Sequence, residues 1–219
     1  MTDIIIPIYN EEKLLRGRAE YFYQLARSGR LIFADGQSTD QSLKVAACYG
    51  NVVAAGYGRA LQMNEAAHHS CGEYLVFLHA DTCVSAEALK TAQQRMSDGA
   101  AGGCFRMQIE EPGVIYRIFE NLVNFRARHF AVLDGDLGLF VRRDIFEHLG
   151  GFDDCPVMED LLFARKLRWA GPVVVLDQPI LVSARRWKED GFFRTFLQYS
   201  TAYIRLWTGN LYIEKNGNA

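Results

Sequence analysis

The chain has 219 residues, 49% of them apolar, which is enough to bury the core of one domain. Lysine and arginine (24) nearly balance aspartate and glutamate (26), so the charge gives no reason to expect a nucleic-acid partner. No apolar run approaches the ~18 residues of a membrane span, and the first residues do not follow a signal-peptide pattern. The five cysteines form no CxxC pair, which favours reduced thiols. We therefore expect a cytoplasmic protein.

Short apolar runs alternate with helical patterns over about residues 1–110. Strands are predicted at residues 4–8, 31–34, 52–55 and 74–78, and helices at 11–27, 38–47, 59–69 and 85–96. This alternation predicts an α/β fold with a mostly parallel central sheet and right-handed crossovers.

The regular alternation ends after Gly102. Further strands are predicted at residues 103–109, 137–141, 173–176 and 180–182, and further helices at 114–130, 159–169 and 190–207. The last helix carries a broad apolar stripe, which is typical of packing against its own domain. Nearby basic residues leave two alternatives open, a homodimer interface and a peripheral contact with the inner face of the membrane.

Polar residues follow three of the first four predicted strands: Asn10-Glu11, Asp35 and Asp81. Because ligands of open α/β sheets bind outside the carboxyl ends of the strands, these residues predict a binding crevice. For each of them a turn or helix-capping role is the alternative, and Asp81 in particular could cap the helix that follows Ser85. The first strand is not followed by the glycines of a dinucleotide site, and the chain has no GxxxxGK[ST] phosphate loop.

An ordered set of motifs resembles those of glycosyltransferase family 2. The motifs are Ile6-Pro7-Ile8-Tyr9-Asn10-Glu11-Glu12, Ala34-Asp35-Gly36-Gln37-Ser38-Thr39-Asp40, Gly58-Arg59-Ala60 with Asn64, His79-Ala80-Asp81, Gly150-Gly151-Phe152, Glu159-Asp160 and Ser183-x-x-Arg186-Trp187. The chain is similar, more narrowly, to a small bacterial subgroup that includes arsenosugar-biosynthesis and selenodomain-associated glycosyltransferases. The resemblance implies a single GT-A domain over residues 1–219. Its parts would be a nucleotide-sugar-binding half (about 1–110), an acceptor and catalytic half (about 111–190) and a C-terminal helical extension (about 190–208).

The resemblance also implies a UDP- or GDP-sugar donor, and transfer to a hydroxyl of a small-molecule or lipid-linked acceptor, usually with inversion. Asp81 is then the expected ligand of Mg²⁺ or Mn²⁺, which would stabilise the diphosphate leaving group. Asp35 would accept a hydrogen bond from the base. The other residues expected around the donor are Pro7, Tyr9, Asn10, Glu11, Arg59, His79, Ala80, Arg186 and Trp187. For Arg59, a solvated basic residue is the alternative.

Two positions depart from the family pattern. His79 stands where the DxD motif has an acidic residue; an imidazole can bind a ribose hydroxyl or a metal, or pack with its nitrogen satisfied by a backbone carbonyl. Ser183 replaces the glutamine of the QxxRW motif, which argues against a processive polymerase.

Asp160 is the expected general base, with Glu159 in support, because transfer to a hydroxyl requires a group that takes its proton. Both residues open a predicted helix, so a structural role as first-turn acids is the alternative. Gly151 and Phe152 are expected on the acceptor side. Asp136 is expected there or in a structural role, since it lies in the other half of the sheet. A nucleotidyltransferase and a non-catalytic sugar-nucleotide-binding module remain the rival functions.

Overall fold

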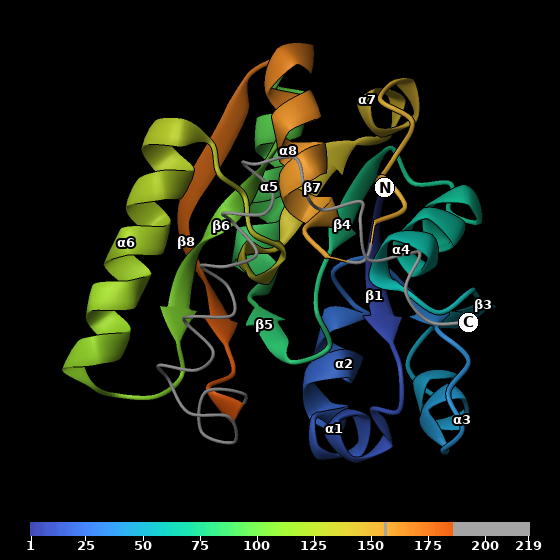
Figure 1. The fold of residues 1–219 in the computed structure, drawn as a ribbon. Coiled ribbons are helices and arrows are strands. Elements are labelled where there is room, and N and C mark those ends of the chain that lie inside the picture. Colours follow the sequence, from blue (N-terminus) through green and yellow to red (C-terminus); the bar gives the residue numbers. More distant parts are fainter. Residues whose placement is uncertain (156, 186–219) are drawn as a thin grey trace, which may run out of the picture.

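A computed structural model describes residues 1–155 and 157–185. Its centre is one eight-stranded sheet with the order β3-β2-β1-β4-β7-β6-β8-β5 (Figure 1). The strands are β1 (Thr2–Ile8), β2 (Arg30–Asp35), β3 (Asn51–Ala54), β4 (Tyr74–Phe77), β5 (Thr82–Val84), β6 (Gly102–Ile109), β7 (Leu139–Arg142) and β8 (Val173–Val182). Only β7 and β5 run against the others, so the predicted mostly parallel α/β sheet is confirmed.

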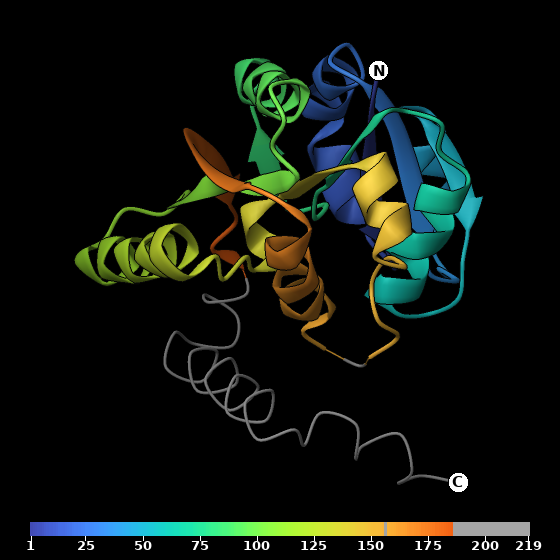
Figure 2. The same cartoon turned by 90° about the horizontal axis from the view of Figure 1, so that it is seen from above.

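Helices cover both faces of this sheet. They are α1 (Glu12–Gly17), α2 (Ala19–Leu25), α3 (Ser42–Ala46), α4 (Arg59–His68), α5 (Ala86–Ser97), α6 (Val114–Phe130), α7 (Arg143–His148) and α8 (Glu159–Ala170), with a 3-10 turn, η1 (Gly135–Leu137). Seen from above, α5 and α8 lie on opposite sides of the strands (Figure 2). In the described part of the chain, no helix combines the length and the apolar character needed to cross a lipid bilayer.

The sheet core is built from continuous apolar runs. Ile4 and Ile5 of β1 and Leu75 and Val76 of β4 are completely buried, as expected for central strands that are covered on both faces. This packing fixes the ends of β1, β2 and β4 in one row, from which the polar loops emerge.

Several predicted elements differ from those observed. The helix predicted over residues 11–27 is two short helices that meet at Arg18, whose φ of -115° is not helical. The two short strands predicted between residues 173 and 182 form one strand, β8, with a register shift against β6 between Cys104 and Arg106. The short elements β5 and α7 were not predicted. The helix predicted at 190–207 lies outside the described residues.

Candidate active site

The loops that follow β1, β2 and β4 meet at one edge of the sheet. Ile8 pairs with Asp35 across the β1–β2 ladder, and β4 pairs with β1 on its other side. Asp35 and the residues after β4 therefore flank β1, about 10 Å apart at the usual spacing of strands. We call this edge, made of residues 8–11, 35–40 and 78–81, the strand-end site.

Asp35 is buried at this edge with one carboxylate oxygen unpartnered. Its Oδ2 accepts a hydrogen bond from the Ser38 backbone N–H (3.1 Å), whereas Oδ1 has no partner among the described residues. Gln62 of α4 holds the neighbouring strand ends together, since its Nε2 donates to the carbonyls of Ile8 and Ala34 at 2.8 Å each. A buried carboxylate oxygen without a donor is costly, so the arrangement favours a ligand that donates to it.

The loops after β1 and β2 are joined by hydrogen bonds. The Asn10 N–H donates to Ser38 Oγ (2.9 Å), and the Thr39 N–H donates to Asn10 Oδ1 (2.8 Å). Asn10 has a φ of 53°, a left-handed conformation that asparagine tolerates better than most residues. These bonds hold the two loops in one arrangement beside Asp35.

Two exposed aromatic rings lie next to each other beside the loops after β1 and β3. Tyr9 follows β1 and Tyr57 follows β3, and their ring centres are 4.9 Å apart in an edge-to-face contact. Their side chains are among the exposed large apolar groups of the chain, although β2 and Asp35 lie between their two strands. Tyr57 was not predicted; its position between Gly56 and Gly58, after a predicted strand, was the available signal.

His79 meets Asp136 and Asp160 beyond the end of β4. Its Nδ1 lies 2.9 Å from Asp136 Oδ1, and a Cβ on Gly135 would lie 3.0 Å from His79 Nε2 and 2.8 Å from Asp160 Oδ2. Burial alone would lower the pKa of His79, but its hydrogen bond to Asp136 and the charges of Asp136 and Asp81 raise that pKa above the usual value. The structure thus brings together three predicted residues that are far apart in sequence.

The Asp136 side chain reaches His79 because of the antiparallel strand β7. Leu139 at the start of β7 pairs with Phe77 at the end of β4, so the preceding turn lies next to the loop after β4. Asp134 in that turn forms an ion pair with Arg126 of α6 (2.8 Å). Burial raises the pKa of Asp134 to about 7, with the negative charges of Asp160 and Asp136 also raising it and Arg126 opposing the shift.

Asp81 is the residue predicted to bind a metal. Its half-buried side chain has no hydrogen bond or ion pair within the described residues, and Ser85, not Asp81, caps α5 by accepting from the Ala88 N–H (3.1 Å). Nowhere in residues 1–155 and 157–185 do three His, Cys, Asp or Glu side chains gather as metal ligands. A single available carboxylate suits a Mg²⁺ or Mn²⁺ ion that a diphosphate also binds, but not an all-protein metal site.

The first turn of α8 contributes Glu159 and Asp160. Glu159 is 2% exposed and forms an ion pair with Arg59, from Nε to Oε1 at 2.8 Å, which joins α8 to the start of α4. Burial raises the pKa of Glu159 and the charge of Arg59 opposes this shift. Asp160 Oδ2 accepts from the Gly135 N–H and Oδ1 from the Leu161 N–H. Arg59, predicted to reach a phosphate, is therefore held by Glu159 in this structure.

The Gly150-Gly151-Phe152 loop is fastened to α4. Asn64 accepts a hydrogen bond from the Phe152 N–H (2.9 Å) and donates one to the Phe152 carbonyl (2.8 Å). Gly151 has a φ of 69°, and a Cβ there would lie 2.6 Å from Asn64 Oδ1, so both the conformation and the space require glycine. The Phe152 ring is buried against Phe77 and Phe163, away from any acceptor in solvent.

The remaining predicted residues lie around the same edge or outside the described chain. Pro7 is half-buried in β1, and Ala80 is buried between His79 and Asp81. Glu11 faces Arg185, the last described residue, with an Oε1–guanidinium distance of 3.7 Å. Arg186 and Trp187 lie outside the described residues.

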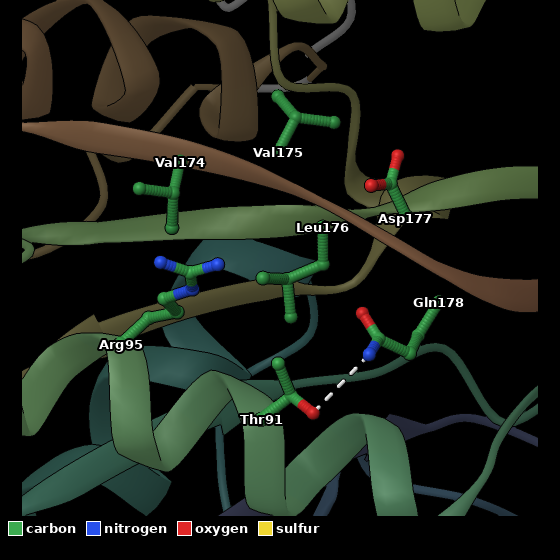
Figure 3. A pocket seen from close by; sticks show the side chains of 7 residues that line it. All are labelled: Thr91, Arg95, Val174, Val175, Leu176, Asp177 and Gln178. Carbon is green, nitrogen blue, oxygen red and sulfur yellow. Dashed lines mark hydrogen bonds between the residues drawn. The ribbon is translucent and has the colours of Figure 1, made fainter.

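A separate hollow of about 360 Å³ lies between α5 and the amino-terminal half of β8 (Figure 3). It is lined by Thr91, Arg95, Val174, Val175, Leu176, Asp177 and Gln178. Gln178 donates to Thr91 Oγ1 across it (3.3 Å), and none of the predicted site residues lines it. The strand-end site is therefore the better candidate for chemistry.

Comparison with known proteins identifies the fold. S. aureus TarS (residues 1–349) has a TM-score of 0.67 at 21% identity, covering 84% of this chain and 60% of TarS 1–349. A mannosyltransferase, PcManGT from Pyrobaculum calidifontis, has a TM-score of 0.64 at 20% identity, covering 82% of this chain and 56% of that protein. The chain thus spans less than two thirds of either structure, and both confirm the predicted GT-A type of fold.

No curated protein matches the sequence significantly. The family model described as Glycosyl transferase family 2 matches residues 3–150, which is more than half of the chain and includes every site residue discussed up to Asp136. The predicted arsenosugar and selenodomain subgroup stays a prediction. Because this family model matches more than half of the sequence, the chain belongs to glycosyl transferase family 2.

Proposed function

We propose that this protein transfers a sugar from a nucleoside-diphosphate donor to an acceptor hydroxyl. The observation that carries the proposal is that Asp160 Oδ2 and His79 Nε2 both lie next to Gly135, at the sheet edge where a buried oxygen of Asp35 has no partner among the described residues. Relatives of similar fold have been solved with UDP-GlcNAc, in TarS, and with GDP-Man and Mn²⁺, in PcManGT. These ligands support a UDP- or GDP-sugar as the donor.

The nucleoside would bind over the loops after β1, β2 and β3. Asp35 Oδ1 would accept the ring N–H of uracil or guanine, which supplies the hydrogen bond that this oxygen lacks among the described residues. The exposed rings of Tyr9 and Tyr57 offer apolar surface beside the base. Glu11 would contact the nucleoside from the end of β1.

Asp81 would hold a divalent cation together with the diphosphate, because its carboxylate has no other partner within the described residues. When bound, such a cation neutralises the charge that develops on the leaving diphosphate. Mg²⁺ and Mn²⁺ both accept this kind of carboxylate and phosphate coordination.

Asp160 would act as the general base. Its carboxylate, in the first turn of α8, accepts hydrogen bonds from the Gly135 N–H of η1 and from the Leu161 N–H, so its position is fixed while an acceptor hydroxyl approaches. The acceptor oxygen would attack the anomeric carbon, Asp160 would take the hydroxyl proton, and the nucleoside diphosphate would leave with the bonding electrons. A single displacement of this kind inverts the anomeric carbon.

The Asp160→Asn variant tests this function. It should bind UDP and GDP as the wild type does, because the loops expected to hold the nucleotide are unchanged and the amide oxygen still accepts one of the two backbone N–H groups. Turnover should fall at least ~100-fold, since the amide cannot take the proton. The assay follows release of nucleoside diphosphate from UDP-GlcNAc and GDP-mannose, with water or added hydroxyl compounds as acceptors. Asp154→Asn, in the exposed part of the loop before α8, is the matched control.

Near-normal turnover of Asp160→Asn would place the base on another residue. Release of pyrophosphate from nucleoside triphosphates would instead support the nucleotidyltransferase, and binding without any turnover of the wild type would support the non-catalytic module.

A further inference from the structure

A histidine that is hydrogen-bonded to a distant carboxylate stands where the DxD motif has its first acidic residue. His79 stands at that position, and a carboxylate from a segment 57 residues further along the chain, Asp136, lies 2.9 Å from its Nδ1. The two side chains are 18% and 24% exposed, so the contact is largely shielded from water. A shielded, charge-assisted hydrogen bond holds geometry better than an exposed one.

Asp136 lies in a turn that is held by hydrogen bonds, an ion pair and the pairing of an adjacent strand. The Leu137 N–H donates to the Asp134 carbonyl (2.9 Å) and the Gly138 N–H to the Gly135 carbonyl (3.1 Å), which closes η1. The Arg126–Asp134 ion pair connects this turn to α6, and the register of β7 against β4 fixes the position of the turn along the strand direction. The carboxylate of Asp136 is thus positioned by the hydrogen bonds of its turn, by the ion pair with α6 and by the pairing of the strand that follows.

The hydrogen bond to Asp136 decides which ring nitrogen of His79 faces the ligand. With Nδ1–H donated to the carboxylate, Nε2 points to the space beside Gly135, and it has no hydrogen-bonding partner among residues 1–155 and 157–185. In neutral imidazole the bond made by one nitrogen sets the protonation of the other. A Cβ on Gly135 would lie 3.0 Å from Nε2 and 2.8 Å from Asp160 Oδ2, so both atoms lie next to this residue and a side chain there would crowd them.

We infer that Asp136 is a positioning residue, which orients His79 so that Nε2 accepts a hydrogen bond from a hydroxyl of the nucleotide sugar beside the base Asp160. This inference rests on the proposed function. It assigns to His79, held in place by Asp136 from a different segment, the donor contact that one carboxylate makes in the family pattern. Asp136 itself does not touch the donor; it acts through the imidazole ring.

The first test is the ring tautomer of His79, which does not depend on activity. The ¹⁵N shifts of the histidine rings are recorded on the full chain at about pH 9, where imidazole is neutral, with His79 assigned by the loss of its signals in His79→Asn. We expect the Nδ1–H form in the wild type and a change toward the Nε2–H form in Asp136→Ala. An unchanged tautomer in Asp136→Ala would overturn the inference.

The second test is a double-mutant comparison of donor use. Asp136→Ala should lower kcat/KM for the nucleotide sugar by about 10–100-fold in the wild type, the usual effect of removing an orienting partner, and by less than about threefold in His79→Ala. Asp136→Asn should recover most of that loss, because its amide oxygen still accepts from Nδ1–H. Asp98→Ala, at the C-terminal end of α5, is the control substitution.

Equal losses in both backgrounds would mean that Asp136 acts independently of His79, and would overturn the inference. If the wild type uses no nucleotide sugar, the proposed function fails, while the tautomer measurement still decides whether Asp136 sets the ring of His79.

Discussion

At the scale of single residues, the carboxylate of Asp35 combines burial with an unsatisfied oxygen. Among the described residues, only the Ser38 N–H donates to it, and Oδ1 has no partner. Its place beside the ends of β1 and β3 makes a donating ligand the simplest source of the missing hydrogen bond. The hydrogen bond that Oδ1 lacks in the protein without ligand would form on binding, and its free energy would contribute to ligand affinity.

Asp35→Asn separates affinity from stability at this position. The new amide places an N–H donor where the N–H of the base would also donate. Affinity for UDP or GDP should therefore fall about 10–100-fold, which corresponds to the free energy of a hydrogen bond to a charged group. The unliganded variant should unfold at the same temperature as the wild type or higher, since a buried charge has been removed. Calorimetric titration and thermal unfolding measure the two effects; unchanged affinity would contradict the assignment of Asp35 to the base.

Asp134 gives a pH dependence of stability. Its pKa is about 7 in the folded protein, raised first by burial, against 3.8 for an ordinary aspartate, so the folded state holds this proton more tightly than the unfolded state. The corresponding stabilisation is complete below about pH 4 and is lost as the pH rises to about 7. Between pH 5 and 8, the free energy of unfolding of the wild type should therefore fall by roughly 2 kcal/mol relative to Asp134→Asn. Urea unfolding at both pH values measures the difference, and parallel behaviour of the two proteins would refute it.

At the scale of elements, α4 connects the strand ends of the candidate site with α8 and the glycine loop. Its first residue, Arg59, pairs with Glu159 of α8, Gln62 holds the ends of β1 and β2, and Asn64 holds the backbone of Phe152. One helix of ten residues thus sets the distance between the strand ends and the glycine loop.

Asn64→Ala removes both hydrogen bonds to Phe152 and leaves that backbone without its partner. We expect a loss of about 1–3 kcal/mol in the free energy of unfolding and a fall in turnover, with nucleoside-diphosphate affinity retained because the strand-end loops are not touched. Asn121→Ala, at an exposed position of α6, is the control. A variant that kept full stability and turnover would show that the loop does not depend on this anchor.

The sequence predicts elements well where the signal is local. The helix at 114–130 was predicted with its observed bounds, and the strand at 103–109 within one residue, because periodicity and glycine boundaries mark both. The contact of Asp136 with His79 could not be predicted, since it depends on β7 pairing antiparallel with β4. The three-residue strand β5 was missed for the same reason: it exists through its distant partner β8. Asp35, Asp81 and Asp160 were predicted as site residues, and their roles remain predictions.

At the scale of the whole molecule, one sheet carries both halves of the site. β7 joins β4 to β6, so the strands β1 to β4 and the strands β6 and β8 form a continuous layer without a linker between them. Asp35 ends β2, His79 follows β4, and Asp160 lies in the first turn of α8, yet all three lie at the edge of this single layer. A ligand that contacts these loops should oppose unfolding of the entire domain, not of one half.

Ligand binding should therefore raise the temperature of the single unfolding transition. At about 100 times its Kd, a nucleoside diphosphate with Mn²⁺ stabilises the folded state by about 2.7 kcal/mol, which is about 5–10 °C for a chain of this size. Because Asp81 is expected to bind the cation jointly with the diphosphate, EDTA in the wild type and the Asp81→Ala substitution should each remove most of the shift. UDP and GDP are compared by differential scanning fluorimetry, with Asp98→Ala as the control for substitution itself. A full shift in EDTA would exclude the cation from donor binding, and two separate transitions, only one of them moved by the ligand, would show that the halves unfold independently.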